Sequence, residues 1–142
     1  MAKLSHSDHD LLLTTVQQIF AQTNYDELPH TMIALLKAAI PCEVIAFNRA
    51  HPVTNEVAVV HNYHDPVFVQ KLFPVLMAHI GEHGVYQNHL ETGSVAVRKI
   101  TDFVSQNKFE RTGLYNEFFR QVGLRSQISL ALPRFGGQGV NA

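Results

Sequence analysis

The chain has little cysteine: one residue, Cys42, among 142. A single cysteine cannot form a disulfide within the chain, and it excludes the cysteine-rich cages that hold structural zinc. Cys42 follows Pro41 and opens the apolar run CEVIAF, which is the usual setting of a buried structural thiol. The sequence therefore predicts neither a disulfide nor a cysteine nucleophile.

An excess of positive charge is also absent. The 11 Lys and Arg residues are balanced by 12 Asp and Glu residues, which gives a formal net charge of -1. Proteins that bind nucleic acid neutralise its phosphates with clustered Lys and Arg side chains. We therefore expect no direct nucleic-acid binding by this chain.

Long apolar runs are missing too. None approaches the roughly 20 residues that a membrane-spanning helix needs, and the first residues, MAKLSHSDHD, lack the apolar region of a secretory signal. We expect a cytoplasmic protein without a membrane partner.

The sequence contains none of the common motifs of catalysis or nucleotide binding. It has no G-x-S-x-G elbow, no P-loop and no G-x-G-x-x-G, and the glycines of the terminal GGQGVNA precede no helix that could hold a phosphate. We therefore expect a protein that is not an enzyme and that has no cofactor.

The length of 142 residues fits one domain, and its sequence pattern predicts helices and short strands. Helical spacing of apolar residues predicts helices over 8–22, 27–40 and 66–80, with a Ser-x-x-Asp capping pattern before the first. A further helical turn should end at Gly93, and a last helix carrying Tyr115, Phe118, Phe119 and Val122 should end at Gly123. Runs rich in β-formers predict a hairpin over 42–50 and 55–63, and strands over 94–100 and 127–132. This mixture predicts an α+β fold with a central antiparallel sheet.

Three segments in the second half resemble the N-terminal sensory region of LuxR-type bacterial transcription regulators. They are Glu82-His83, KITDF at 99–103 and LYNEFFRQVGL at 114–124, and their order and spacing fit together. The resemblance implies a GAF-like fold, in which helices flank an antiparallel sheet that often holds a small ligand. It also implies that a helix-turn-helix DNA-binding domain would normally follow, and this sequence shows none.

The end of the chain departs from that family pattern. In the regulators, the strand that matches SQISLALP is followed by two more strands and a helix, whereas this chain continues only with RFGGQGVNA. We expect a sensor domain over 1–133 that lacks the last strands of the sheet, followed by a flexible glycine-rich tail over 134–142. Two readings remain open: either the last strand has lost its partners and exposes an edge, or the tail bends back and pairs locally or the late strand lies at the edge of the sheet.

The nine histidines suggest an alternative function as a metal-binding protein. His79 and His83 have the i, i+4 spacing of a helical zinc site, and His61 and His64 lie close together near the end of the hairpin. However, Gly81 and Gly84 interrupt any regular helix there. We favour no metal site, and we expect His83 to cap a helix, because the resembling family tends to place a histidine at this position.

Aromatic residues are the better candidates for a ligand site. Tyr63, Tyr86, Phe103 and Tyr115 could line an apolar pocket for an unknown small molecule, with the tyrosine hydroxyls orienting it. Phe47 and Phe119 are better interpreted as core residues.

The helix expected over 8–22 has a wide apolar arc. Leu11, Leu12, Leu13, Val16, Ile19 and Phe20 spread over more of the helix than one packed face needs. We expect this helix to mediate a homodimer, with the last strand as a second possible contact.

Overall fold

The computed structural model describes residues 3–24, 26–50, 54, 56–129, 131–135 and 138–141. It divides into two compact units. Unit 1 comprises Met1–Phe47 and Val59–Tyr63, and unit 2 comprises Asn48–Ala58 and His64–Ala142. None of the helices in the described ranges combines the length and the apolarity that crossing a bilayer requires.

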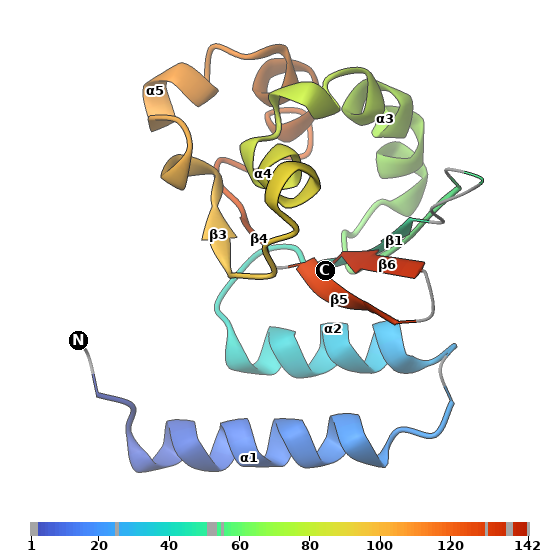
Figure 1. Cartoon of the computed structure of the whole chain (residues 1–142), viewed down its shortest axis with the longest axis vertical. Helices are drawn as coiled ribbons and strands as arrows, with labels where there is room; N and C mark the ends of the chain where they lie inside the picture. The colour runs from blue at the N-terminus through green and yellow to red at the C-terminus, as the bar shows by residue number, and fades with distance from the viewer. Residues whose placement is uncertain are drawn as a thin grey trace. The chain divides into compact units, whose positions relative to one another are not determined.

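Unit 1 begins with two helices, α1 (His6–Ala21) and α2 (Leu28–Ala39). The predicted cap of α1 is confirmed: the Ser5 hydroxyl accepts the Asp8 N–H at 3.1 Å, and the Asp8 carboxylate accepts the Ser5 N–H at 2.8 Å. The two helices lie side by side and run in opposite directions (Figure 1). Ile33 of α2 is buried, whereas α1 has no buried residue. Much of the apolar surface of α1 therefore remains exposed within the chain.

The predicted hairpin is present as β1 (Ala46–Ala50) and β2 (Val57–His61). Asn62 extends the pairing at the open end of the hairpin: its N–H donates to the Ile45 carbonyl at 3.2 Å, and its side-chain oxygen accepts the Ile45 N–H at 2.7 Å. The four-stranded sheet has the order β2-β1-β6-β5, where β5 is Ala131–Phe135 and β6 is Gln138–Asn141. The α+β fold class predicted from the sequence is thus confirmed.

The end of the chain corrects two expectations. The single strand expected over 127–132 is divided: β4 (Ile128–Ser129) pairs with β3 (Arg98–Lys99), and β5 belongs to the larger sheet. The domain boundary expected at residue 133 falls within β5, and residues 138–141 of the expected tail form β6, which pairs with both β5 and β1. Of the two open readings, the structure shows the second: the tail bends back and pairs within the chain. Backbone groups alone form such a ladder, so a side-chain pattern did not reveal it.

Pro133 lies where β5 is irregular. The register between β5 and β6 shifts between Leu132 and Phe135, and β5 is at the edge of the described sheet. A proline has no N–H to donate, and edge strands and bulges are where a sheet accepts one. The sheet therefore ends at this strand without a break in its inner ladders.

Unit 2 contains the remaining helical segments, which Figure 1 shows from green to orange. They are α3 (Pro66–Ala78), η1 (Ile80–Glu82), α4 (Gly84–Thr92), η2 (Ile100–Asp102), α5 (Gln106–Phe109) and η3 (Leu114–Phe119). The expected stops are confirmed, because Gly93 and Gly123 adopt positive φ angles of 67° and 74°, which other residues rarely tolerate.

The core of unit 2 gathers residues from four of these segments. Val85, Ile100, Phe109, Leu114 and Phe119 form one buried cluster. The Phe109 ring meets the Phe119 ring edge to face at 5.3 Å, which is a favourable arrangement for aromatic pairs. Phe47 and Phe119, both expected in the core, are buried.

The last helix, η3, is a π-helix rather than the ordinary helix that the sequence predicted. The Arg120 N–H donates to the Tyr115 carbonyl at 2.7 Å, five residues back. The wider turn leaves Phe119 and Val122 buried and Tyr115 and Phe118 partly buried. π-helices are rare and frequently lie at functional sites.

Candidate functional site

The four aromatic candidates for ligand binding belong to different parts of the structure. Tyr63 is half-buried in unit 1, directly after β2. Tyr86, Phe103 and Tyr115 are all in unit 2: Tyr86 in α4, Phe103 just after η2 and Tyr115 in η3. The ligand site that these residues were predicted to form remains a prediction. The three residues of unit 2 can be described together.

Phe103 packs against the first residue of α4. A Cβ atom at Gly84 would lie 2.8 Å from the Phe103 Cβ and 3.2 Å from its Cγ, so the aromatic ring uses the space that a side chain would need. Phe103 is nevertheless 41% exposed. The structure thus places Phe103, which is partly exposed, beside the start of the helix that carries Tyr86.

Tyr115 packs on the core cluster of unit 2. Its ring meets that of Phe109 edge to face at 5.4 Å, and its N–H donates to the Thr112 hydroxyl at 3.1 Å. The side chain is half-buried. Tyr115 therefore has a structural role in addition to any contact with a ligand.

His83 caps α4, as the sequence predicted. Its Nδ1 accepts the Tyr86 N–H at 3.2 Å, which places the ring proton of a neutral imidazole on Nε2. Nε2 lies 2.9 Å from the side-chain oxygen of Gln127 and donates to it. Burial lowers the pKa of His83 below its ordinary value, and the Gln127 contact opposes that shift. The buried, neutral ring joins α4 to the segment that leads into β4.

Glu82 contacts the start of η3. Its carboxylate accepts the Leu114 N–H at 2.7 Å, which satisfies one of the donors that the first turn of a helix leaves free. Sequence reasoning did not assign this role to Glu82. Glu82 was noticed only as part of the family resemblance, and the structure shows that it contacts another resembling segment, at 114–124.

His79 lies between two carboxylates. Its Nε2 is 3.1 Å from Glu117 Oε2 on η3, and its Nδ1 is 3.5 Å from Glu82 Oε1 on η1. The hydrogen bond with Glu117, with smaller contributions from both negative charges, raises the pKa of His79 above its ordinary value. The His79–Glu117 pair is 38 residues apart in sequence, and no local pattern indicated it.

Three of the four histidines of the alternative metal site have other roles. His79 follows the end of α3 and His83 precedes α4, so the i, i+4 pair is not on one helix. His61 Nδ1 accepts the Tyr63 N–H at 3.2 Å. Across the described residues, no three His, Cys, Asp or Glu side chains are placed to hold a metal ion.

A surface hollow is present elsewhere, in unit 1. It has a volume of about 260 Å³ and is lined by Ile19 and Phe20 of α1, Gln22 and Leu28. None of the predicted ligand residues lines it. It was not anticipated from the sequence, because its lining comes from both α1 and α2, which no local pattern relates.

Comparison with known proteins places the fold but not the family. No family model matches the sequence, and no curated protein matches it. Among solved structures, the chain is similar to the ligand-binding (LBD) domain of VqsR from Pseudomonas aeruginosa, with a TM-score of 0.61 and 14% sequence identity over 96% of this chain and 78% of that chain. At this identity, the similarity shows a shared fold.

Proposed function

We propose that this chain is the sensory, ligand-binding domain of a LuxR-type transcription regulator and that it binds a small molecule without transforming it. The observation that carries the proposal is the fold shared with a ligand-binding domain over 96% of the chain. Fold alone does not determine function, so the residues must supply the rest.

The residues that resemble the LuxR-type family provide the second support. Glu82 accepts a hydrogen bond from the Leu114 N–H, and this contact joins two of the three segments in which the resemblance lies. His83 contacts Gln127, which precedes β4. A GAF-like character of the fold belongs to the same proposal.

For the ligand we propose a small, largely apolar molecule that contacts Tyr86, Phe103 and Tyr115 of unit 2. Phe103 offers an accessible aromatic ring, and Tyr86 and Tyr115 are half-buried. Such side chains combine apolar contact area with a polar group that orients a ligand. Tyr63 of unit 1 remains a candidate from the sequence alone.

Tyrosine fluorescence offers a direct test, because the chain has four tyrosines and no tryptophan. Titration with a panel of small metabolites should change the emission with one of them, in a saturable manner. Tyr86→Ala should weaken the binding of that molecule by about tenfold or more, the loss typical of a central contact residue. Tyr25→Ala, outside the candidate set, should leave affinity unchanged.

Equal affinity in the Tyr86→Ala and Tyr25→Ala variants, with circular dichroism showing that both are folded, would contradict the placement of the ligand. In that case, Phe103→Ala and Tyr63→Ala would show whether another candidate residue contributes.

We also propose that the chain forms a homodimer through α1, with a second copy as the partner. The exposed apolar residues of α1 are Leu11, Leu12, Leu13, Val16 and Phe20, and Phe20 is 85% exposed. The second contact expected from the sequence, an edge near the last strand, stays a prediction: Ser129 pairs with Arg98 within the chain, whereas β5 lies at the edge of the larger sheet.

A charge placed in the apolar face of α1 should separate the dimer. Val16→Glu should give a monomer by light scattering at high micromolar concentration, since an ionised carboxylate in an apolar interface loses its hydration. Gln18→Glu adds the same charge at another exposed position of the helix and should leave the dimer intact. A monomeric unmodified chain at that concentration would contradict the proposal.

A further inference from the structure

The His79 ring lies over Gly113, the residue that immediately precedes η3. A Cβ atom at Gly113 would be 2.3 Å from His79 Cε1 and 2.6 Å from Nδ1, far inside normal contact distance. The glycine therefore provides the space in which the ring lies. Because His79 follows the last residue of α3, this contact joins the end of α3 to the beginning of η3.

The two ring nitrogens of His79 face carboxylates from two further positions. Glu117 of η3 is 3.1 Å from Nε2, and Glu82 of η1 is 3.5 Å from Nδ1. In the described part of the chain, these are the charged groups within ion-pair distance of the ring. The second oxygen of Glu82 accepts the Leu114 N–H, so the contact extends to the first backbone amide of η3.

This arrangement fits a protonated ring. A neutral imidazole has one N–H, so one of its nitrogens would direct a lone pair at a carboxylate oxygen, whereas an imidazolium donates from both nitrogens. The raised pKa of His79, caused first by the hydrogen bond with Glu117, agrees with this geometry. The ring is 24% exposed and the carboxylates are 40% and 61% exposed, so salt should weaken the interaction.

We propose that His79 is a pH-dependent latch on the π-helix: the imidazolium holds Glu82 and Glu117 together, and the neutral ring releases one of them. The proposal goes beyond ligand binding and stands whether or not the chain binds a ligand. Its consequence for a sensor would be that pH alters the order of η3, which carries Tyr115 and Phe119.

The direction of the effect follows from linkage between protonation and folding. The folded chain raises the pKa of His79, so the stabilisation is present below the unfolded pKa and is lost as pH rises through the folded pKa. His83 acts in the opposite sense, because its lowered pKa makes the fold less stable as pH falls. The contribution of the latch must therefore be measured as a difference between the unmodified chain and a His79 variant.

Nuclear magnetic resonance of the full chain tests the latch directly. The His79 ring signals are identified by their absence in His79→Gln and followed from about pH 5 to pH 8. The midpoint of their titration should lie above the ordinary pKa of histidine. The Leu114 amide should shift with the same midpoint, because its acceptor is the carboxylate that faces the ring. In His79→Gln this shift of the Leu114 amide should be lost.

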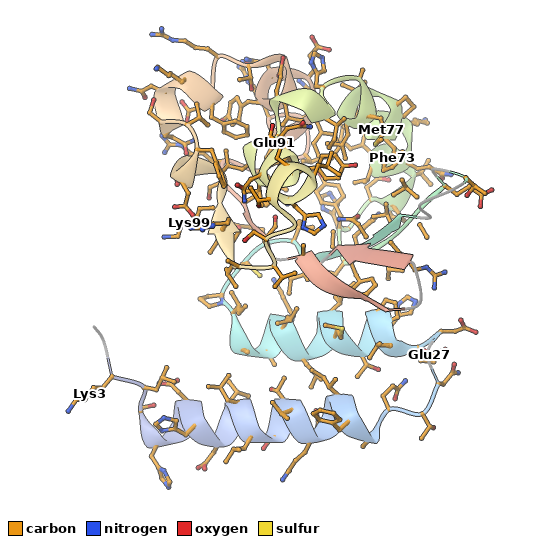
Figure 2. The ribbon with its side chains drawn as sticks, viewed as in Figure 1. Lys3, Glu27, Phe73, Met77, Glu91 and Lys99 are labelled. Carbon is orange, nitrogen blue, oxygen red and sulfur yellow. The ribbon has the colours of Figure 1, made fainter. Side chains whose placement is uncertain are left out.

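Two carboxylate variants separate a specific contact from a general effect of charge. Glu117→Gln should lower the His79 midpoint toward its ordinary value, whereas Glu91→Gln, which removes the same charge from an exposed position of α4 (Figure 2), should leave it unchanged. Equal midpoints in these two variants, or a Leu114 amide that does not follow the His79 titration, would overturn the proposal.

Discussion

Replacing Phe109 with alanine should destabilise unit 2 by about 3–5 kcal/mol, which is a large share of the 5–15 kcal/mol that typically holds a domain together. Phe109 is 0% exposed and meets the rings of Tyr115 and Phe119 edge to face. Its removal leaves a cavity among side chains from several segments that cannot all move inward. The measurement is chemical denaturation followed by circular dichroism.

Leu90→Ala is the control for this prediction. It truncates a large apolar side chain that is 55% exposed in α4, outside the proposed dimer contact, so its effect on stability should remain within about 0.5 kcal/mol. Comparable losses in the two variants would mean that Phe109 is not in the core as described. If Phe109→Ala does not fold, Phe109→Leu, which retains most of the volume, should fold with a smaller loss.

Alanine at Gly84 should destabilise the chain by about 1–3 kcal/mol, the usual consequence of overpacking. The new Cβ would be 2.8 Å from the Phe103 Cβ, an atom attached directly to the backbone, so no side-chain rotation relieves the overlap. Either α4 or the segment after η2 must shift. Because Phe103 and Tyr86 are candidate ligand residues on these two segments, ligand affinity should fall as well.

Gly81→Ala provides the comparison for Gly84→Ala. No atom lies within 4 Å of a Cβ built at Gly81, and the residue has no positive φ. Its stability should therefore change by less than about 0.5 kcal/mol. A Gly84→Ala variant as stable as Gly81→Ala would show that Phe103 does not pack on α4 in solution.

The parts of the fold that could be predicted from the sequence have local causes. The spacing of apolar residues located α1 and α2, and the Ser5–Asp8 cap follows from residues three apart. The stop at Gly93 was likewise correct, because it depends on a few neighbouring residues, whereas the cap at His83 was expected from the family resemblance.

The parts that could not be predicted depend on residues far apart in sequence. Glu82 contacts Leu114 over 32 residues, and His83 contacts Gln127 over 44. The C-terminal hairpin, in which Leu132 of β5 is opposite Val140 of β6, was only one of two open readings, because the glycine-rich tail has no alternating pattern of side chains. The π-helix was missed for a related reason: its apolar residues fit an ordinary helical stripe, and the i→i+5 bonds differ only in the backbone.

The candidate site shows the same division. Aromatic residues could be chosen by type, but the sequence did not show that Phe103 lies against Gly84 or that Tyr115 packs on Phe109. Both residues of β3 are exposed, including Lys99, which is labelled in Figure 2. The sequence of this strand did not show whether it would be exposed or buried. Residue type identified candidate ligand-binding residues. Only the tertiary contacts distinguish those with a structural role from those that are accessible to a ligand.

The central claim is that the chain is a ligand-binding sensor domain, and native mass spectrometry tests it most directly. The purified full chain would be incubated with fractionated small-molecule extract from the cells that encode it. The account predicts one fraction in which each chain carries one small molecule of constant, unmodified mass, and a loss of that adduct in Tyr86→Ala but not in Tyr25→Ala. Ligand-free protein in every fraction, or a bound molecule that emerges chemically altered, would contradict it.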